Sequence, residues 1–220
     1  MDQQRIRIKV CGMSDLKNIR DVEALRPDYI GFIFYDKSPR YVDHDLPKTL
    51  PSVQRVGVFV DATVEECLDK TKTYDLDVLQ LHGNESPQFC TILREKILKT
   101  IPEKDMELWK VFGIKDTFDF SILENYETSI DKFLFDTKGK AKGGNGYTFD
   151  WSVLKHYPSR KPIILSGGIG PEEINAVEQI LKTDLPIYAL DLNSKFEIQP
   201  GLKDSQKLER FMSIRTLAAN

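Results

Sequence analysis

Apolar residues along this chain gather in eight short runs, each followed by turn or polar residues. Within a run the apolar residues are nearly continuous and include many β-branched and aromatic types. Such runs are typical of strands that are buried on both faces, as in a parallel sheet. The eight predicted strands are Ile6–Val10, Tyr29–Phe34, Arg55–Val60, Val78–Leu81, Leu108–Phe112, Lys132–Phe135, Pro162–Leu165 and Ile187–Leu190.

The segments between these runs are polar, and several carry helix-start signals. Thr63 followed by Glu66 is a capping box, in which each residue caps the backbone of the other. Proline at a first helical position and acidic residues in a first turn mark other starts. Helices are predicted after Thr63, Ser86, Gly170 and Asp204. The connections 43–51 and 118–126 predict short or irregular helices.

Eight strand–helix units in 220 residues predict the fold. This count suits a small (β/α)₈ barrel, the TIM barrel, as a single α/β domain over residues 1–220. A doubly wound open sheet of eight strands is the alternative, and the pattern alone does not exclude it. In both folds ligands bind at the carboxyl ends of the strands, so the residues after each run are the candidates for function.

Composition narrows the classes of function. With 31 basic and 34 acidic side chains the net charge is -3, which argues against a nucleic-acid binder. The longest apolar run, Tyr29–Tyr35, is too short to span a membrane. The cysteines Cys11, Cys67 and Cys90 are odd in number and form no CxxC, so neither a disulfide framework nor a structural zinc site is expected. We predict a cytoplasmic protein that contacts neither nucleic acid nor membrane.

The clearest ligand signal follows the seventh predicted strand. Ser166, Gly167 and Gly168 form a glycine turn that leads into a helix start. Glycines let the backbone approach a ligand closely, and the N–H groups of a helix N-terminus bind phosphate. Barrels commonly bind phosphate between the loops after strands seven and eight. A plain glycine turn is the alternative, but the position predicts a phosphate site.

Four other strand-end residues carry reactive or charged groups. Cys11 ends the first strand and Asp136 the sixth, so a thiol and a carboxyl group could serve as base and acid across a barrel mouth. A buried, inert cysteine is the alternative. Arg40 follows Ser38 and a proline that fixes the turn, and its guanidinium suits a carboxylate unless it is solvated. A single histidine, His82, makes no metal site, and we expect it to hydrogen-bond in or beside the mouth.

A series of motifs over almost the whole chain resembles phosphoribosylanthranilate isomerase, and the motifs occur in that family's order. They are residues 9–13 (KVCGM), 31–34 (GFIF), 38–42 (SPRYV), 56–61 (VGVFVD), 79–86 (LQLHGNES), 135–137 (FDT), 143–146 (GGNG), 149–151 (FDW), 165–169 (LSGGI), 191–194 (DLNS) and 200–204 (PGLKD). SPR alone is a weak signal, whereas the ordered set is very specific.

The resemblance implies a (β/α)₈ barrel that acts in tryptophan biosynthesis. Its reaction is the Amadori rearrangement of N-(5-phosphoribosyl)anthranilate to 1-(2-carboxyphenylamino)-1-deoxyribulose 5-phosphate, without a metal or organic cofactor. The resemblance implies Cys11 as general base and Asp136 as general acid. A thiolate is the active base, so we expect the pKa of Cys11 to be lowered. We expect no obligate protein partner.

The same resemblance assigns the binding residues. It implies that Arg40 lies against the anthranilate end of the substrate and that the loops after strands seven and eight hold the phosphate. The predicted substrate-binding residues are Arg40, His82, Ser166, Gly167, Gly168, Asp191, Asn193 and Ser194. One departure concerns Lys195, where the family usually has a small residue. A contact between its ammonium group and the phosphate is one alternative. The other is that the ammonium group extends into solvent, and we expect the second.

Two other kinds of barrel are considered. Another phosphosugar isomerase would need several metal ligands at its strand ends, or an aspartate in place of Cys11 and a second phosphate loop. A non-catalytic ligand-binding barrel would keep the phosphate glycines and lose the acid or the base. Because Cys11 and Asp136 are both present, the isomerase prediction is preferred.

Overall fold

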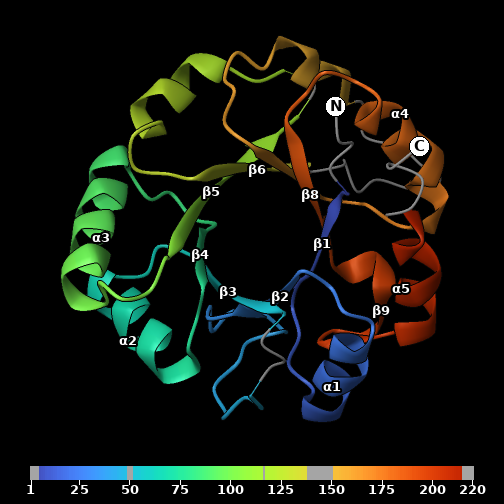
Figure 1. Cartoon of the computed structure of the whole chain (residues 1–220), viewed down its shortest axis with the longest axis horizontal. Helices are drawn as coiled ribbons and strands as arrows, with labels where there is room; N and C mark the ends of the chain where they lie inside the picture. The colour runs from blue at the N-terminus through green and yellow to red at the C-terminus, as the bar shows by residue number, and fades with distance from the viewer. Residues whose placement is uncertain (1–4, 49–51, 116, 138–150, 215–220) are drawn as a thin grey trace.

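The computed structural model describes residues 5–48, 52–115, 117–137 and 151–214, and it shows a closed barrel of eight parallel strands with helices outside (Figure 1). Each strand pairs with the next along the chain, and the last pairs with the first. The strands are β1 (Arg7–Val10), β2 (Tyr29–Ile33), β3 (Gln54–Phe59), β4 (Val78–Leu81), β5 (Glu107–Ile114), β6 (Lys132–Thr137), β7 (Ile163–Ser166) and β8 (Ile187–Leu192). The predicted barrel is confirmed, and the open sheet is excluded.

The closing pair, β1 and β8, joins segments from the two ends of the chain. Its register places Arg7 opposite Ala189 and Lys9 opposite Asp191. β8 and β6 run past their predicted ends, so Asp191 and Asp136 lie within strands and not after them. The reason is that ladder hydrogen bonds continue beyond the apolar run into the polar mouth of the barrel.

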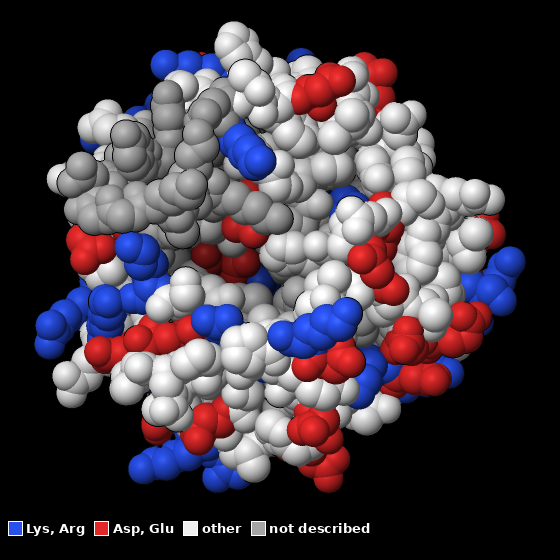
Figure 2. Space-filling model, turned by 180° about the vertical axis from the view of Figure 1, so that it is seen from behind, with Lys and Arg blue, Asp and Glu red and all other residues white. Residues whose placement is uncertain are grey.

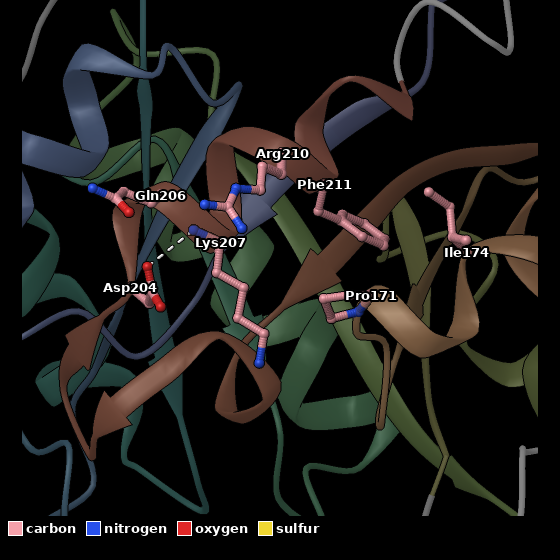
Figure 3. A pocket seen from close by; sticks show the side chains of 7 residues that line it. All are labelled: Pro171, Ile174, Asp204, Gln206, Lys207, Arg210 and Phe211. Carbon is pink, nitrogen blue, oxygen red and sulfur yellow. Dashed lines mark hydrogen bonds between the residues drawn. The ribbon is translucent and has the colours of Figure 1, made fainter.

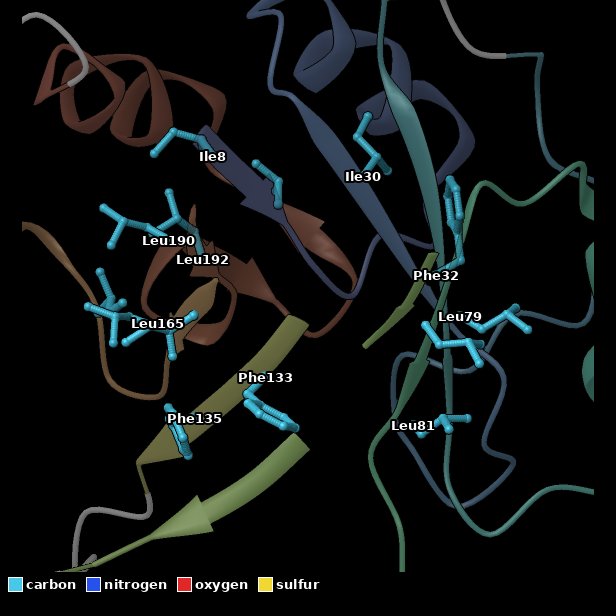
Figure 4. Close-up of a cluster of buried hydrophobic side chains, with 14 of the residues drawn as sticks. Ile8, Ile30, Phe32, Leu79, Leu81, Phe133, Phe135, Leu165, Leu190 and Leu192 are labelled. Atoms are coloured by element: carbon cyan, nitrogen blue, oxygen red, sulfur yellow. The ribbon is translucent and has the colours of Figure 1, made fainter. Parts of the chain in front are cut away.

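Two buried clusters result from the alternation of side chains along the strands. The smaller cluster fills the barrel and consists of Tyr29, Val56, Val78, Trp109, Val111, Leu134, Ile164 and Ala189. The larger cluster contains strand residues together with helix residues such as Ile19, Leu93 and Leu208, so it lies between the strands and the helices. Figure 4 draws its members on β1, β2, β4, β6, β7 and β8. This double burial explains the continuous apolar runs.

The outer layer consists of five α-helices and four 3₁₀ helices among the described residues. The α-helices are α1 (Leu16–Ala24), α2 (Val64–Tyr74), α3 (Pro87–Thr100), α4 (Ile174–Leu181) and α5 (Ser205–Met212). The 3₁₀ helices are η1 (Phe120–Tyr126), η2 (Trp151–His156), η3 (Pro171–Glu173) and η4 (Ser194–Phe196). A hairpin of β9 (Glu197–Gln199) and β10 (Leu202–Lys203) follows η4. No described helix has both the length and the apolarity to cross a membrane.

Three of the four predicted helix starts are confirmed at the residue expected. Thr63 and Glu66 form both hydrogen bonds of the capping box at α2. The Ser86 and Asp204 side chains accept hydrogen bonds from backbone N–H groups of α3 and α5. After Gly170 the chain first forms the short η3, and α4 begins only at Ile174.

The two connections predicted as short helices differ. Residues 120–126 form η1, capped by Asp119, as expected for an irregular helix. The segment predicted over 43–51 is wrong for residues 43–48, which contain no helix, while 49–51 lie outside the described residues. Pro47 lacks a backbone donor and disfavours a helical conformation at the residue before it, so no turn of helix forms there.

We predict that Thr63→Ala lowers the free energy of unfolding by about 1 kcal/mol, because the first turn of α2 loses its side-chain acceptor. Thr73→Ala, at an exposed position of the same helix, is the matched control and should change stability by less than about 0.5 kcal/mol. Urea unfolding followed by circular dichroism measures both. Equal losses in the two variants would contradict a capping role for Thr63.

Candidate active site

A cavity of about 350 Å³ lies at the carboxyl ends of the strands. Its lining contains all ten residues that the sequence predicted for the site, and Lys195, Ile33, Val58, Gln80 and Ile169 complete it. The alternation of side chains along the strands explains why these residues meet. Leu134, Ile164 and Ala189 point into the barrel, and the residues two positions further along each strand point the same way, one layer closer to the cavity. That layer includes Asp136, Ser166 and Asp191.

The surface around the cavity carries charges of both signs. On the face drawn in Figure 2, basic and acidic side chains are interspersed around a central hollow. Among the described residues of this face, neither sign forms a broad continuous area. This distribution agrees with the net charge of -3 and leaves recognition of an anion to local groups.

The two predicted catalytic residues enter the cavity from different sides of the barrel. Cys11 follows β1 and is almost fully buried, while Asp136 on β6 is partly exposed to the cavity. Gly31 on β2 makes room for the thiol, because a Cβ atom there would lie 2.9 Å from the Cys11 Sγ. The sequence reasoning did not assign this role to Gly31, although the glycine interrupts the longest apolar run.

Asp136 has a histidine neighbour. His82 Nε2 lies 3.4 Å from Asp136 Oδ2, and the other ring nitrogen lies 3.4 Å from Gln80 Nε2. The loop that carries His82 is held by the buried ion pair of Lys110 and Glu85, at 3.0 Å. Glu85 also accepts hydrogen bonds from the backbone of this loop, so the ring is presented from a rigid support.

A buried ion pair crosses the closing seam just below the cavity. Lys9 Nζ donates to Asp191 Oδ1 at 2.8 Å, and Ser166 Oγ donates to the other oxygen at 3.1 Å. Although burial by itself lowers the pKa of Lys9, Asp191 and Cys11 raise it above its ordinary value, so Lys9 is a permanent cation. Both carboxylate oxygens of Asp191 are engaged by protein donors, and its contact with substrate stays a prediction.

Burial raises the pKa of the Cys11 thiol, and Asp191 raises it further, while Lys9 and Lys203 act in the opposite direction. The net shift of the Cys11 pKa is upward, so the prediction of a lowered pKa is wrong. The physical reason is that desolvation of a nearly inaccessible thiolate outweighs the attraction of the two buried ammonium groups.

Arg40 comes from the turn after β2, and its side chain lies beside Gly12, the residue that follows Cys11. Its backbone N–H donates to Ser38 Oγ at 3.1 Å, and Tyr41 forms a bridge with Ile33, which confirms that this turn is fixed. The guanidinium is not free, because Nε and Nη2 donate to the two oxygens of Glu197 at 2.8 and 2.5 Å. Sequence reasoning missed Glu197 because it lies in the β9–β10 hairpin and not at the end of a barrel strand.

The predicted phosphate-binding turns face the cavity. Gly167 and Gly168 have φ values of 86° and 67°, in the left-handed region, and a Cβ at Gly168 would meet nothing within 4 Å. Asn193 and Ser194 line the same cavity after the neighbouring strand, where β8 passes into η4. The glycine-rich segment Gly143–Gly146 is outside the described residues.

Lys195 lines the rim of the same cavity. Its side chain is about half exposed, and its Nζ lies 3.8 Å from Glu172 Oε2, an exposed carboxylate. Its stem packs against Gly170, where a Cβ would lie 3.0 Å from the Lys195 Cβ. The expectation that its ammonium group does not serve the phosphate stays a prediction, and this geometry agrees with it.

A second cavity, of about 500 Å³, lies outside the barrel between η3 and α5 (Figure 3). Its lining consists of Pro171, Ile174, Asp204, Gln206, Lys207, Arg210 and Phe211. The Asp204 side chain caps α5, and Lys207 Nζ donates to the Lys195 carbonyl, so two of its polar groups already stabilise the fold. Its lining contains no thiol and no imidazole. No group of three or more metal-ligating side chains occurs in the described parts of the chain.

Comparison with known proteins now decides between the barrel families. The model of the family described as N-(5'phosphoribosyl)anthranilate (PRA) isomerase matches residues 8–213. The chain belongs to this family. Among PRA isomerases, that of Parabacteroides distasonis is 45% identical over 214 residues, covering 93% of this chain and 91% of that protein.

Solved PRA isomerases share the fold. That of Thermus thermophilus has a TM-score of 0.77 at 28% identity, covering 98% of this chain and 100% of its own. Another was solved in complex with reduced 1-(o-carboxyphenylamino)-1-deoxyribulose 5-phosphate. It has a TM-score of 0.73 at 28% identity, with coverage of 96% of this chain and 98% of its own.

Gly12 provides a test of how tightly the mouth is packed. It has φ of 73°, and a Cβ would lie 2.6 Å from Arg40 Cδ and 2.8 Å from Asn193 Oδ1. We predict that Gly12→Ala costs at least about 1 kcal/mol more unfolding free energy than Gly168→Ala, since both are strained in φ but only the first creates clashes. Equal costs, measured by urea unfolding, would show that the Arg40 and Asn193 side chains move aside freely.

Proposed function

We propose that the chain performs its family's isomerisation in the barrel mouth, with Asp136 as general acid and Cys11 as general base. The substrate is N-(5-phosphoribosyl)anthranilate, and the product is 1-(2-carboxyphenylamino)-1-deoxyribulose 5-phosphate. The observation that carries the proposal is the convergence of an acid, a thiol, a fixed guanidinium and a glycine turn on one cavity. Its volume of about 350 Å³ is in the range of small-molecule sites.

In the first step Asp136 gives its proton to the furanose ring oxygen. The C1′–O bond breaks, the nitrogen lone pair forms the C=N bond, and the ring opens to a protonated Schiff base. Asp136 is suited to this step because it is on the cavity wall and His82, 3.4 Å away, offers a second polar group that fixes its orientation. The acid and its neighbour come from β6 and the loop after β4, and the pairing of both strands with β5 brings them together.

In the second step Cys11, as thiolate, removes the proton from C2′. The electron pair left behind forms the C1′=C2′ bond and neutralises the iminium nitrogen, which gives an enolamine that tautomerises to the ketone. Lys9 and Lys203 favour the thiolate, while burial opposes it, so the active form is a minor species at neutral pH. A base with these neighbours is strong when it forms, because a higher pKa goes with greater proton affinity.

The two charged ends of the substrate define its direction in the site. Arg40 holds the anthranilate carboxylate through the donors that Glu197 leaves open. The turns at Ser166–Gly168 and Asn193–Ser194 hold the phosphate through backbone N–H groups and side chains. The ligand of the solved relative has both a carboxyl and a phosphate group, so a family member binds a molecule with these two charged ends.

Complementation of an isomerase-deficient tryptophan auxotroph tests the activity as a whole. Growth without tryptophan supports it, and failure of a soluble, expressed chain to complement would favour the non-catalytic barrel. The single domain over 1–220, the cytoplasmic location, and the absence of a cofactor and of an obligate protein partner stay predictions.

We predict that Asp136→Asn folds normally but loses at least about a hundredfold in kcat, because an amide of the same shape cannot act as the acid. The matched control is Asp69→Asn, at an exposed position on α2, which should retain its kcat. Steady-state kinetics with both variants decide it. A loss smaller than about tenfold in Asp136→Asn, or 1.4 kcal/mol of barrier, would remove Asp136 from the acid role.

The raised pKa of Cys11 predicts the pH dependence. Because burial raises the pKa of the thiol above its ordinary value, the Cys11 thiolate should form only beyond about pH 8.5, where an exposed thiol has half titrated. The ultraviolet absorbance of the thiolate, taken as the difference between the chain and Cys11→Ser, should rise over this pH range. Half-titration of this absorbance below about pH 8.5 would contradict the raised pKa.

A further inference from the structure

A chain of four charged or polar side chains connects two residues that line the cavity, Arg40 and Asn193. Arg40 donates to both oxygens of Glu197, Lys203 Nζ donates to Glu197 Oε1 at 2.6 Å, and the same ammonium donates to Asn193 Oδ1 at 2.7 Å. Arg40 and Asn193 line the cavity, whereas Glu197 and Lys203 lie behind it, in the β9–β10 hairpin. One buried carboxylate is therefore bound to Arg40 directly and to Asn193 through Lys203.

The hairpin that carries Glu197 and Lys203 is fixed against the start of the barrel. The Lys203 backbone N–H donates to Asn18 Oδ1 at 2.6 Å, and Asn18 Nδ2 donates back to the Lys203 carbonyl at 2.9 Å. At the hairpin turn, Gly201 has φ of 86°, and a Cβ there would lie 2.1 Å from Ser14 Oγ. These contacts hold the hairpin against α1 and the loop that follows Cys11.

Glu197 leaves the outer edge of the Arg40 guanidinium available. A guanidinium has five N–H donors, and Glu197 takes the one on Nε and one of the two on Nη2. Three remain, and the Nη1 and Nη2 donors of the outer edge have the spacing of a second carboxylate. Glu197 thus does not compete with a ligand but fixes the plane and direction in which Arg40 meets it.

Lys203 determines the charge of the group. Arg40 and Glu197 alone would be neutral together, and the fully buried Lys203 leaves the three side chains with a net charge of one positive unit. Burial by itself raises the pKa of Glu197, but Arg40 and Lys203 hold it below its ordinary value, so the carboxylate is ionised. The group keeps an attraction for an anion that the Arg40–Glu197 pair alone would lack.

We propose that Glu197 and Lys203 are positioning residues of the isomerase: Glu197 orients Arg40 toward the ligand carboxylate, and Lys203 ties Glu197 to Asn193 in the loop after β8. Sequence position gives neither residue such a role. The proposal rests on the proposed function, in which Arg40 meets the carboxylate of the ligand and Asn193 its phosphate.

The test compares two ligands by calorimetry, reduced 1-(o-carboxyphenylamino)-1-deoxyribulose 5-phosphate and the same compound without its carboxyl group. The ratio of the two affinities measures the preference for the carboxylate. Lys203→Met removes the charge and both bonds, so this ratio should fall at least about tenfold, and the decarboxylated ligand should also bind more weakly because Asn193 loses its donor. KM should rise by at least about tenfold. A fall in kcat is also expected, because Lys203 favours the Cys11 thiolate, so the preference ratio is the readout that tests positioning.

Glu197→Gln separates positioning from charge. This variant raises the net charge of the group, so a purely electrostatic role predicts a higher preference for the carboxylate. The positioning role predicts a lower one, because the amide N–H₂ would face the Nη2 donors of Arg40 and turn the guanidinium away. A preference that rises or stays unchanged would overturn the proposal, and it would do so even if Lys203→Met failed to fold.

Two further variants complete the design. Lys132→Met breaks a Lys–Glu pair of 2.5 Å at the opposite end of the barrel and should lower stability without changing the preference or KM. If it changed them as much as Lys203→Met does, the effect would be one of general stability, and the proposal would fail. Arg40→Ala should abolish the preference. If Arg40→Ala keeps the preference, Arg40 does not bind the carboxylate and that part of the proposed function is wrong. If the preference is lost in Arg40→Ala but not in the Glu197 and Lys203 variants, only the roles of Glu197 and Lys203 are overturned.

Discussion

The pairing of β1 with β8 is the contact on which this structure depends. It closes the sheet and thereby removes the exposed edges that an open sheet would present. Lys9 and Asp191 are partners in its register and form a fully buried ion pair across the seam, 182 positions apart in the chain. Removing one partner of such a pair typically costs about 3–5 kcal/mol, a large part of the stability of a domain.

The same seam determines the chemistry of the mouth. Cys11 is two residues beyond Lys9 on β1, so closure places the thiol beside an ammonium group and near the Asp191 carboxylate. Burial of the thiol raises its pKa, and the cations limit that rise. The surroundings of the Cys11 thiol, and with them the fraction of it that is ionised, therefore depend on the pairing of β8 with β1.

Buried charges near the mouth are engaged by partners that hold elements together. Lys110 and Glu85 fix the loop of His82, and Lys203 and Glu197 fix the hairpin beside Arg40. Buried ion pairs contribute little net stability compared with apolar residues of the same size, because desolvation offsets their attraction. Their value here is directional, since each hydrogen-bonded pair fixes the orientation of a loop that an apolar contact would leave free to rotate.

Local patterns predicted much of this protein. The eight apolar runs identified all eight strands of the barrel, since burial on both faces requires continuous apolarity. The caps at Thr63, Ser86 and Asp204 could also be predicted from the sequence, because a cap is a contact between residues three positions apart. A helix over 43–51 was a wrong prediction at its described residues, where Pro47 decided against it.

The sequence by itself also determined which reactive residues stand at the strand ends, and hence that Cys11, Asp136, Arg40 and the glycine turn share one mouth. Only the tertiary structure decided their partners. Glu197 and Lys203 reach Arg40 and Asn193 from a hairpin outside the barrel, and no local spacing indicates that. The direction of the Cys11 pKa shift was likewise undetermined, because it is the difference between desolvation and the pull of distant charges, and both depend on how the barrel closes.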